Sequence, residues 1–276
     1  KLNRKLLMPI INSFIKDMDK VRVLDYGCGW GTFLLSLPRN KILVYGFDII
    51  KNTIKTLEKT MQLFGRQLFC IEINEDAEIS PNGFDIILTN PPFAGSHDEP
   101  EILGRYDLSY KGNKAQNKRA KKMRKDMLYI EKCIRLVKPN GRIAIVLPQG
   151  NLNNPSSEFL RNFIFDNCRL LGCVGLHENT FRPFTPTKTS VVLLQKWKNQ
   201  EEKLNEYKIF MAISNKPGKD NSGNYIYLKN KDGNFVDEKG KLLDVKATPK
   251  VVDHDLEEVV LAFEKFKNSE NINFHE

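Results

Sequence analysis

The chain has 276 residues, 41% of them hydrophobic and 28% charged, as is typical of a soluble globular protein with one large or two modest domains. Its net charge of +9, from 43 basic and 34 acidic residues, favours a polyanionic partner. No apolar stretch approaches the roughly 20 residues of a membrane helix, and no signal peptide is recognisable, so we expect no membrane partner. The five cysteines show no CxxC or metal-binding spacing, which predicts free thiols in a reducing cytosol and no metal site.

Strands and helices alternate along the first part of the chain. Apolar runs predict strands at 21–25, 42–48, 67–73, 84–89 and 142–147, and helices at 32–37, 51–64, 116–137 and 156–167. Two further strands, at 170–176 and 189–194, follow each other without a helix, as in a hairpin. The pattern predicts a doubly wound α/β fold with a mostly parallel seven-stranded sheet and an antiparallel hairpin at its edge.

The composition changes near residue 198. The later residues are polar and rich in turn signals such as Lys231-Asp232-Gly233-Asn234, and a short amphipathic helix is predicted at 256–266. We therefore expect a first domain at 1–198 and a polar, partly ordered C-terminal extension at 199–276 that could contact a partner.

A glycine-rich turn follows the first predicted strand. Asp25 ends that strand, and Gly27, Gly29 and Gly31 follow in a GxGxG spacing that differs from the GxGxxG of dinucleotide enzymes. A carboxylate here can bind a ligand ammonium, and Asp48 at the next strand end can accept both hydroxyls of a ribose. S-adenosylmethionine carries an amino acid at one end and a ribose at the other, so these residues predict it as the cofactor. The alternative for Asp25 alone is a helix-capping carboxylate.

The most informative motif is Asn90-Pro91-Pro92-Phe93, directly after the strand at 84–89. Proline fixes φ and turns the Pro91 carbonyl toward a ligand, while the Asn90 side chain supplies a second acceptor. Two acceptors can hold the two hydrogens of an exocyclic amino group while a flat ring lies under its heterocycle. The motif therefore predicts an amino-methyltransferase site with these four residues as its catalytic group.

A basic run follows this motif by under twenty residues. Eight basic residues and no acidic one lie between Lys111 and Lys125. A solvated helix face or a mobile loop is the plain interpretation of such a run, but its place close to the motif favours contact with phosphates.

The chain resembles the N6-adenine DNA methyltransferases, and in particular the modification subunits of type I restriction–modification systems. The matching segments occur in the same order, at 25–34 (DYGCGWGTFL), 84–94 (FDIILTNPPFA), 139–150 (PNGRIAIVLPQG) and 181–194 (FRPFTPTKTSVVLL). The resemblance implies a Rossmann-like fold, S-adenosylmethionine as methyl donor, and methylation of adenine N6 in double-stranded DNA after the base is flipped into the pocket.

The resemblance also assigns roles by position. Asn90 and the Pro91 carbonyl would accept the two N6 hydrogens, and Phe93 would stack on the adenine. Cofactor contacts are expected at four successive strand ends, namely at Asp25, Tyr26, Gly27, Cys28, Gly29, Thr32, Phe33, Asp48, Ile49, Asn74, Glu75 and Asn90. Which residue near Asn74 contacts the cofactor adenine stays open. Trp30 is expected to pack rather than to stack on substrate, and residues 182–188 either face DNA or form a plain hairpin connection.

The sequence begins after a family segment that helps to close over the cofactor, and no target-recognition domain is recognisable. We therefore expect a shortened relative from a prokaryotic cytoplasm that binds cofactor weakly. It would need a specificity subunit to select DNA, with a restriction subunit as a further partner. Two other functions stay open: a methyltransferase of the same fold that acts on RNA or on protein glutamine, and a non-catalytic DNA-binding or scaffold subunit.

Overall fold

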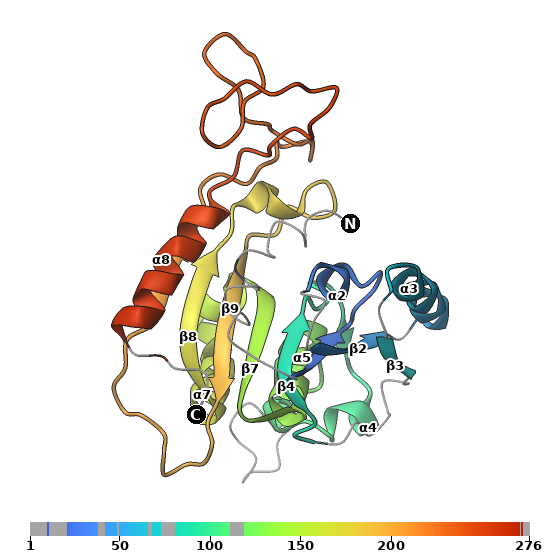
Figure 1. Ribbon diagram of the computed structural model, residues 1–276. Helices are drawn as coiled ribbons and strands as arrows, with labels where there is room; N and C mark the ends of the chain where they lie inside the picture. The colour runs from blue at the N-terminus through green and yellow to red at the C-terminus, as the bar shows by residue number, and fades with distance from the viewer. Residues whose placement is uncertain are drawn as a thin grey trace.

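An eight-stranded sheet forms the centre of the fold in the computed structural model, which describes residues 10, 21–37, 42–48, 50–65, 68–72, 81–110, 119–270 and 272 (Figure 1). The strands lie side by side in the order β10 (Phe210–Ile213), β8 (Cys168–Gly175), β9 (Thr189–Lys196), β7 (Val137–Pro148), β4 (Phe84–Thr89), β1 (Val21–Tyr26), β2 (Ile42–Asp48) and β3 (Leu68–Glu72). Strand β9 runs antiparallel to both of its neighbours, and all other neighbouring pairs are parallel. The predicted doubly wound, mostly parallel sheet is confirmed.

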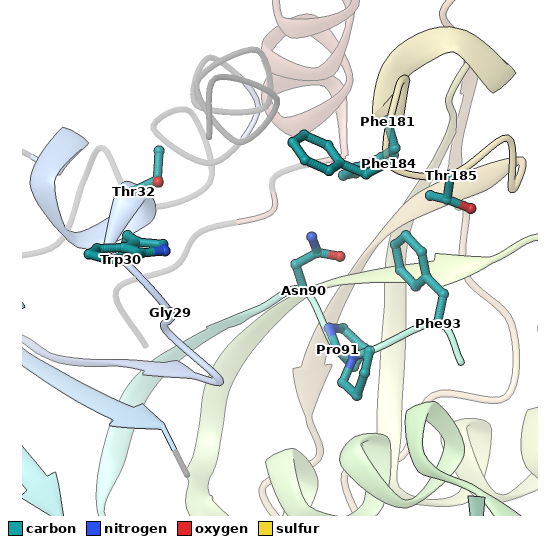
Figure 2. Close-up of a pocket in the computed structure, with 10 residues that line it drawn as sticks. Gly29, Trp30, Thr32, Asn90, Pro91, Phe93, Phe181, Phe184 and Thr185 are labelled. Carbon is teal, nitrogen blue, oxygen red and sulfur yellow. The ribbon is translucent and has the colours of Figure 1, made fainter. Parts of the chain in front are cut away.

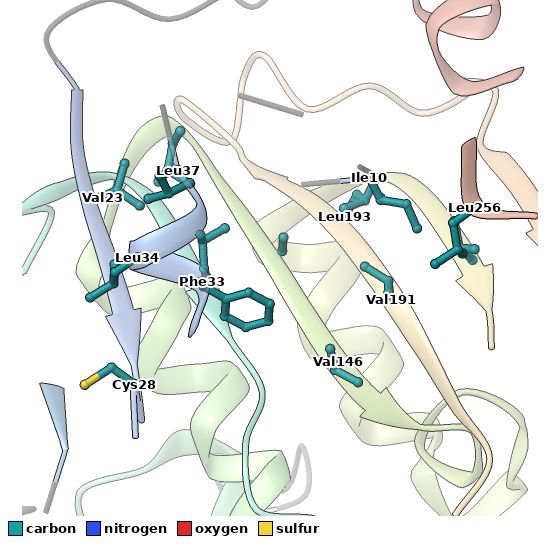
Figure 3. Packing of buried hydrophobic residues seen from close by; sticks show 14 of the residues in the cluster. Ile10, Val23, Cys28, Phe33, Leu34, Leu37, Val146, Val191, Leu193 and Leu256 are labelled. Carbon is teal, nitrogen blue, oxygen red and sulfur yellow. The ribbon is translucent and has the colours of Figure 1, made fainter. Parts of the chain in front are cut away.

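Two layers of helices cover the sheet. The helices are α2 (Thr32–Ser36), α3 (Lys51–Leu63), α4 (Pro100–Leu103), α5 (Lys125–Leu136), α6 (Gly150–Asn153), α7 (Glu158–Asn167) and α8 (Leu256–Ser269), with short 3-10 turns η1 (Asp107–Tyr110), η3 (Pro155–Ser157) and η4 (Glu178–Phe181). Because side chains alternate along a strand, Val23 and Ile86 face the core under α2, α3 and α8, part of which Figure 3 shows. Leu24 and Ile87 face the core under α5 and α7. None of the described helices is long and apolar enough to cross a membrane.

The sheet departs from the sequence prediction at one edge. The hairpin of β8 and β9 is present, but β9 lies between β7 and β8 rather than at the margin. The edge is occupied by β10, an eighth strand that the sequence did not indicate, which pairs in parallel with β8. The eighth strand comes from the predicted C-terminal extension, and α8 from the same extension packs Phe263 into the main core. The domain boundary at residue 198 stays a prediction.

The helix predicted at 116–137 is wrong over residues 119–124, which are not helical, and its first predicted residues, 116–118, lie outside the described part of the chain. Helix α5 begins only at Lys125. Before it, β6 (Met123–Arg124) pairs antiparallel with β5 (Ser96–His97), so the chain is extended where helical periodicity was inferred. Met123 is buried in this pairing.

Residues 215–254, called the arm below, leave the sheet after β10 and return at α8. The arm projects beyond one end of the sheet, in orange in Figure 1. It contains three similar turns in which Asp220, Asn230 or Asp237 accepts hydrogen bonds from the backbone N–H groups two and four residues later. A glycine with φ between 79° and 88° lies three residues after each of them. The turns thus depend on short-range Asx hydrogen bonds and on glycine.

The cysteines whose side chains are described, Cys28, Cys133, Cys168 and Cys173, are free thiols, as predicted. Burial raises the pKa of Cys168 to about 12, and it raises the pKa of Cys133 further. Because the thiolate is the reactive form, we expect iodoacetamide at pH 8 to spare both residues in the native protein and to modify them in urea. Peptide mass spectrometry of the two samples measures this difference. Equal labelling in both samples would contradict the packing described here.

Candidate active site

A cavity of about 800 Å³ opens at the carboxyl ends of the central strands, a size within the usual range of ligand pockets. Its walls come from the turn after β1, the segment after β4 and the connection between β8 and β9. The residues that line it are Gly29, Trp30, Thr32, Asn90, Pro91, Pro92, Phe93, Phe181, Phe184 and Thr185. Figure 2 shows the Asn90 side chain pointing into the space between Trp30 on one side and the phenylalanine rings on the other.

Backbone hydrogen bonds fix the glycine turn against β2. The N–H groups of Gly27 and Cys28 both donate to the Phe47 carbonyl, at 2.9 and 2.8 Å. The Gly29 N–H donates to Asp48 Oδ2 at 2.8 Å, and the other Asp48 oxygen accepts from the Ile50 N–H at 2.9 Å. The carboxylate that the sequence assigns to a ribose therefore also orients the glycine turn.

Two glycines of this turn have different surroundings, although both have positive φ. A Cβ atom at position 31 would lie 2.2 Å from Leu57 Cδ1, so the turn packs closely on α3 there. A Cβ atom at position 29 would meet no atom within 4 Å, because Gly29 faces the cavity. The backbone at Gly29 is thus open to a ligand, which fits a cofactor that lies along the main chain.

The end of β4 carries the asparagine of the motif. The Thr89 hydroxyl donates to the Tyr26 carbonyl at 2.6 Å and holds the tips of β4 and β1 together. Immediately after it, Asn90 Oδ1 is buried and has no hydrogen-bond partner among the described residues. A buried oxygen without a partner costs free energy, and a ligand N–H in the cavity would satisfy it. Asn90 is therefore well placed to accept a hydrogen bond from a ligand.

Aromatic rings form two sides of the cavity. The rings of Phe93 and Phe181 meet edge to face, with centroids 5.5 Å apart. Trp30 is 50% exposed and Phe184 is 75% exposed, although both are large apolar side chains. Exposed aromatic rings around a cavity are suited to stacking on a flat ligand. Trp30 lines the cavity and is half exposed, and its expected packing in place of stacking on substrate stays a prediction.

The sequence analysis predicted only part of this aromatic wall. Phe181, Phe184 and Thr185 belong to residues 176–188, called the cavity loop below, which connects β8 to β9. The sequence left this segment open between a DNA-facing loop and a plain hairpin connection. The two phenylalanines in Phe181-Arg182-Pro183-Phe184 were the available signal.

The predicted site residues divide into three groups. Those that line the cavity are Gly29, Thr32, Asn90, Pro91, Pro92 and Phe93. Those that lie beside it are Asp25, Tyr26, Gly27, Cys28, Phe33 and Asp48; Asp25 is fully buried at the end of β1, and the side chains of Cys28 and Phe33 pack in the core. The third group, Ile49, Asn74 and Glu75, lies outside the described residues. The cofactor contacts and catalytic roles of all three groups stay predictions.

The described part of the basic run lies next to the motif. The pairing of Ser96 with Arg124, and the hydrogen bond from the Lys125 N–H to the Gly95 carbonyl, bring the run beside the segment that follows Phe93. Buried Asp126 accepts hydrogen bonds from Arg124 Nε at 3.0 Å and from Asn151 Nδ2 at 2.8 Å, which anchors the start of α5. The exposed residues Lys121 and Lys122 come directly before this pairing in the chain.

The sheet, with one antiparallel strand beside β7, and the glycine turn after β1 define the class of S-adenosylmethionine-dependent methyltransferases. A protein from Listeria monocytogenes described as a class I methyltransferase of this kind shares the fold, with a TM-score of 0.64 and 17% identity over 76% of this chain and 64% of that one. The chain belongs to the N-6 DNA methylase family, whose model matches residues 4–268. Family and fold together imply S-adenosyl-L-methionine as the cofactor.

Two further relatives come from type I restriction enzymes. The methylase subunit of the type I restriction enzyme EcoEI from Escherichia coli is 25% identical over 210 residues, which cover 65% of this chain and 39% of the relative. The M protein of the type I restriction enzyme EcoKI shares the fold, with a TM-score of 0.53 and 16% identity over 87% of this chain and 51% of that one. The chain thus spans well under two thirds of the length of these relatives.

Proposed function

We propose that the chain methylates the N6 amino group of adenine in DNA, as the catalytic part of a type I modification subunit. The observation that carries the proposal is the buried Asn90 oxygen without a partner among the described residues, at the wall of an aromatic cavity beside the glycine turn. An adenine amino group has two hydrogens to donate. Asn90 Oδ1 would accept one and the Pro91 carbonyl the other.

The chain's own residues would act by holding the base. When bound, S-adenosylmethionine supplies a methyl group on a positively charged sulfur. Hydrogen bonds to both N6 hydrogens would localise the nitrogen lone pair toward that methyl group. Formation of the N–C bond would break the C–S bond and leave a neutral thioether, and the amino group would then lose one proton to solvent. Catalysis rests on positioning and on exclusion of water rather than on a strong base. The rings of Phe93 and Phe181 would stack on the base and offset the few kcal/mol that flipping costs.

The cofactor would lie between the glycine turn and the ends of β1 and β2. Gly29 leaves room for it along the backbone, and Thr32 lines the same side of the cavity. Asp25 would receive its ammonium and Asp48 its ribose. These roles combine a close backbone approach with carboxylates at adjacent strand ends, which suits a charged and hydroxylated ligand.

The type I relatives support the finer part of the proposal. One is a methylase subunit and the other is an M protein of a type I restriction enzyme. By this likeness we propose double-stranded DNA as substrate and a specificity subunit as partner, with a restriction subunit in the complete assembly.

The test is a transfer assay on unmethylated plasmid DNA with the chain and radiolabelled S-adenosylmethionine, followed by digestion to nucleosides. We expect label in N6-methyldeoxyadenosine. Total RNA and a protein extract serve as competing substrates in parallel reactions. Label in RNA or in glutamine instead of DNA would overturn the proposal, as would saturable cofactor binding with no transfer to any of the three substrates.

The basic run gives a second expected result. Replacing Lys121 and Lys122 with alanine should weaken binding to duplex DNA and lower the slope of log affinity against log salt by about 2, because each phosphate contact contributes about 0.9. Fluorescence anisotropy at several salt concentrations measures the slope. The control pair is Lys198→Ala with Lys203→Ala, which removes the same charge near the opposite ends of the strands, beside Trp197. Equal slopes for the two pairs would contradict a role for the run.

A further inference from the structure

The first turn of the arm is fastened to the cavity loop by two hydrogen bonds. Lys219 Nζ donates to the Arg182 carbonyl at 2.8 Å, and Asn179 Nδ2 donates to Asn221 Oδ1 at 2.8 Å. The backbone of Gly223 lies directly on Pro183, since a Cβ atom at position 223 would be 2.6 Å from Pro183 Cδ. With φ at +88°, this position also favours glycine for its conformation. We call this set of interactions the arm contact.

Lys219 is unusual for a lysine because it is only 3% exposed. Burial lowers the pKa of its ammonium, and the ring of Tyr225 lies 5.3 Å from Nζ. Burying an ammonium costs free energy unless good acceptors surround it. The hydrogen bond to the Arg182 carbonyl therefore fixes the backbone of the cavity loop from outside the loop.

Apart from the arm contact, the described hydrogen bonds to the cavity loop from outside lie at its ends, where the Gln149 N–H donates to the Lys188 carbonyl and the Leu176 N–H donates to the Thr189 carbonyl, both at 2.9 Å. Its middle bonds to itself. The N–H groups of Phe184 and Thr185 both donate to the Phe181 carbonyl, at 3.0 and 3.2 Å. Such bonds fix the shape of the loop, whereas its direction relative to Asn90 depends on the packing of Phe181 in the core and on the arm contact. The Arg182 carbonyl lies between Phe181 and Phe184 in the chain, so the arm contact acts on both rings of the cavity wall at once.

We propose that Lys219 and Asn221 are positioning residues for the substrate base: through the cavity loop they set the aromatic wall that faces Asn90. This inference rests on the proposed function for the identity of the ligand as a DNA base. The position of the aromatic wall does not depend on the proposed function. Neither side chain lines the cavity. The arm thereby determines how well the cavity holds a flat ligand.

The position of the wall can be measured without any substrate. 4-Fluorophenylalanine at position 181 gives one ¹⁹F resonance, whose shift depends on the edge-to-face contact with Phe93. We expect Lys219→Met and Asn221→Ala each to move or broaden this resonance. The matched control is Lys229→Met, which removes an exposed lysine of the arm whose ammonium lies 4.9 Å from the Phe235 ring, away from the cavity loop. An unchanged resonance in both test variants would overturn the proposal.

Kinetics separate positioning from general damage to the fold. Loss of one hydrogen bond should raise the KM for plasmid DNA about three- to tenfold in Lys219→Met and Asn221→Ala, with cofactor affinity and Tm close to those of Lys229→Met. A moved resonance with an unchanged KM would also overturn the proposal. If the intact chain does not methylate DNA, the proposed function fails. Titration with adenine nucleosides then still decides whether the wall holds a base, because binding would shift or broaden the ¹⁹F resonance of position 181.

Discussion

Replacement of Asn90 with alanine is expected to lower the rate of methyl transfer by at least about 100-fold, the usual effect of removing one preorganised hydrogen-bonding group from an active site. The Asn90 oxygen is buried without a partner among the described residues, so it has no evident structural task whose loss would explain such an effect. The measurement is kcat with saturating cofactor and DNA. Thermal unfolding of the variant should match that of the parent.

Asn90→Asp is the informative companion, because it keeps the size and one acceptor but adds a charge. A carboxylate can still accept a hydrogen bond from an amino group, so partial activity that exceeds that of Asn90→Ala is expected. Parent-like turnover in Asn90→Ala would remove the central support for an amino-methyltransferase site.

Substitution of alanine at Gly31 should destabilise the protein by about 3 kcal/mol. The Cβ atom would lie 2.2 Å from Leu57 Cδ1, and φ is +66°. Overpacking typically costs 1–3 kcal/mol and a left-handed backbone about 1–2 kcal/mol more. Urea denaturation followed by circular dichroism measures the free energy of unfolding.

Gly29→Ala is the matched control for that experiment, since its φ is +51° and its Cβ atom would meet no atom within 4 Å. It should cost about 1 kcal/mol in stability but at least about tenfold in cofactor affinity, because the methyl group enters the cavity. Cofactor binding can be followed by Trp30 fluorescence after Trp197→Phe, as the chain has two tryptophans. A stable Gly29→Ala variant with parent affinity would place the cofactor elsewhere.

Local sequence predicts the central strands well. The predicted bounds of β4 match the structure and those of β1 differ by one residue, because each is an apolar run ended by glycine or by Asn-Pro. Strand β10 could not be predicted in this way. Its four residues leave Met211 and Ile213 exposed, and it exists through pairing with β8, which is distant in sequence.

The same distinction between local and long-range structure applies to the candidate site. Gly29 and Asn90 could be placed together from sequence because they follow adjacent parallel strands, whose carboxyl ends share one edge. Phe181 and Phe184 could not, because their place depends on β9 turning back between β7 and β8. No local pattern specifies that order of strands. The hydrogen bond from Gly29 to Asp48 likewise joins two turns whose separation only the folded chain determines.

The arm leaves and rejoins the fold at one place. Asp255, directly before α8, accepts hydrogen bonds from the Ser214 hydroxyl and from the N–H groups of Asn215 and Lys216. Because the two ends of the arm meet, closing it as a loop costs the fold little conformational entropy, and this cost grows only slowly with the length of the loop. The part of the arm beyond its first turn is therefore a natural position for exchange: another segment could be grafted between Tyr227 and Val252, which pair across the arm, to give the same catalytic scaffold a different outer surface.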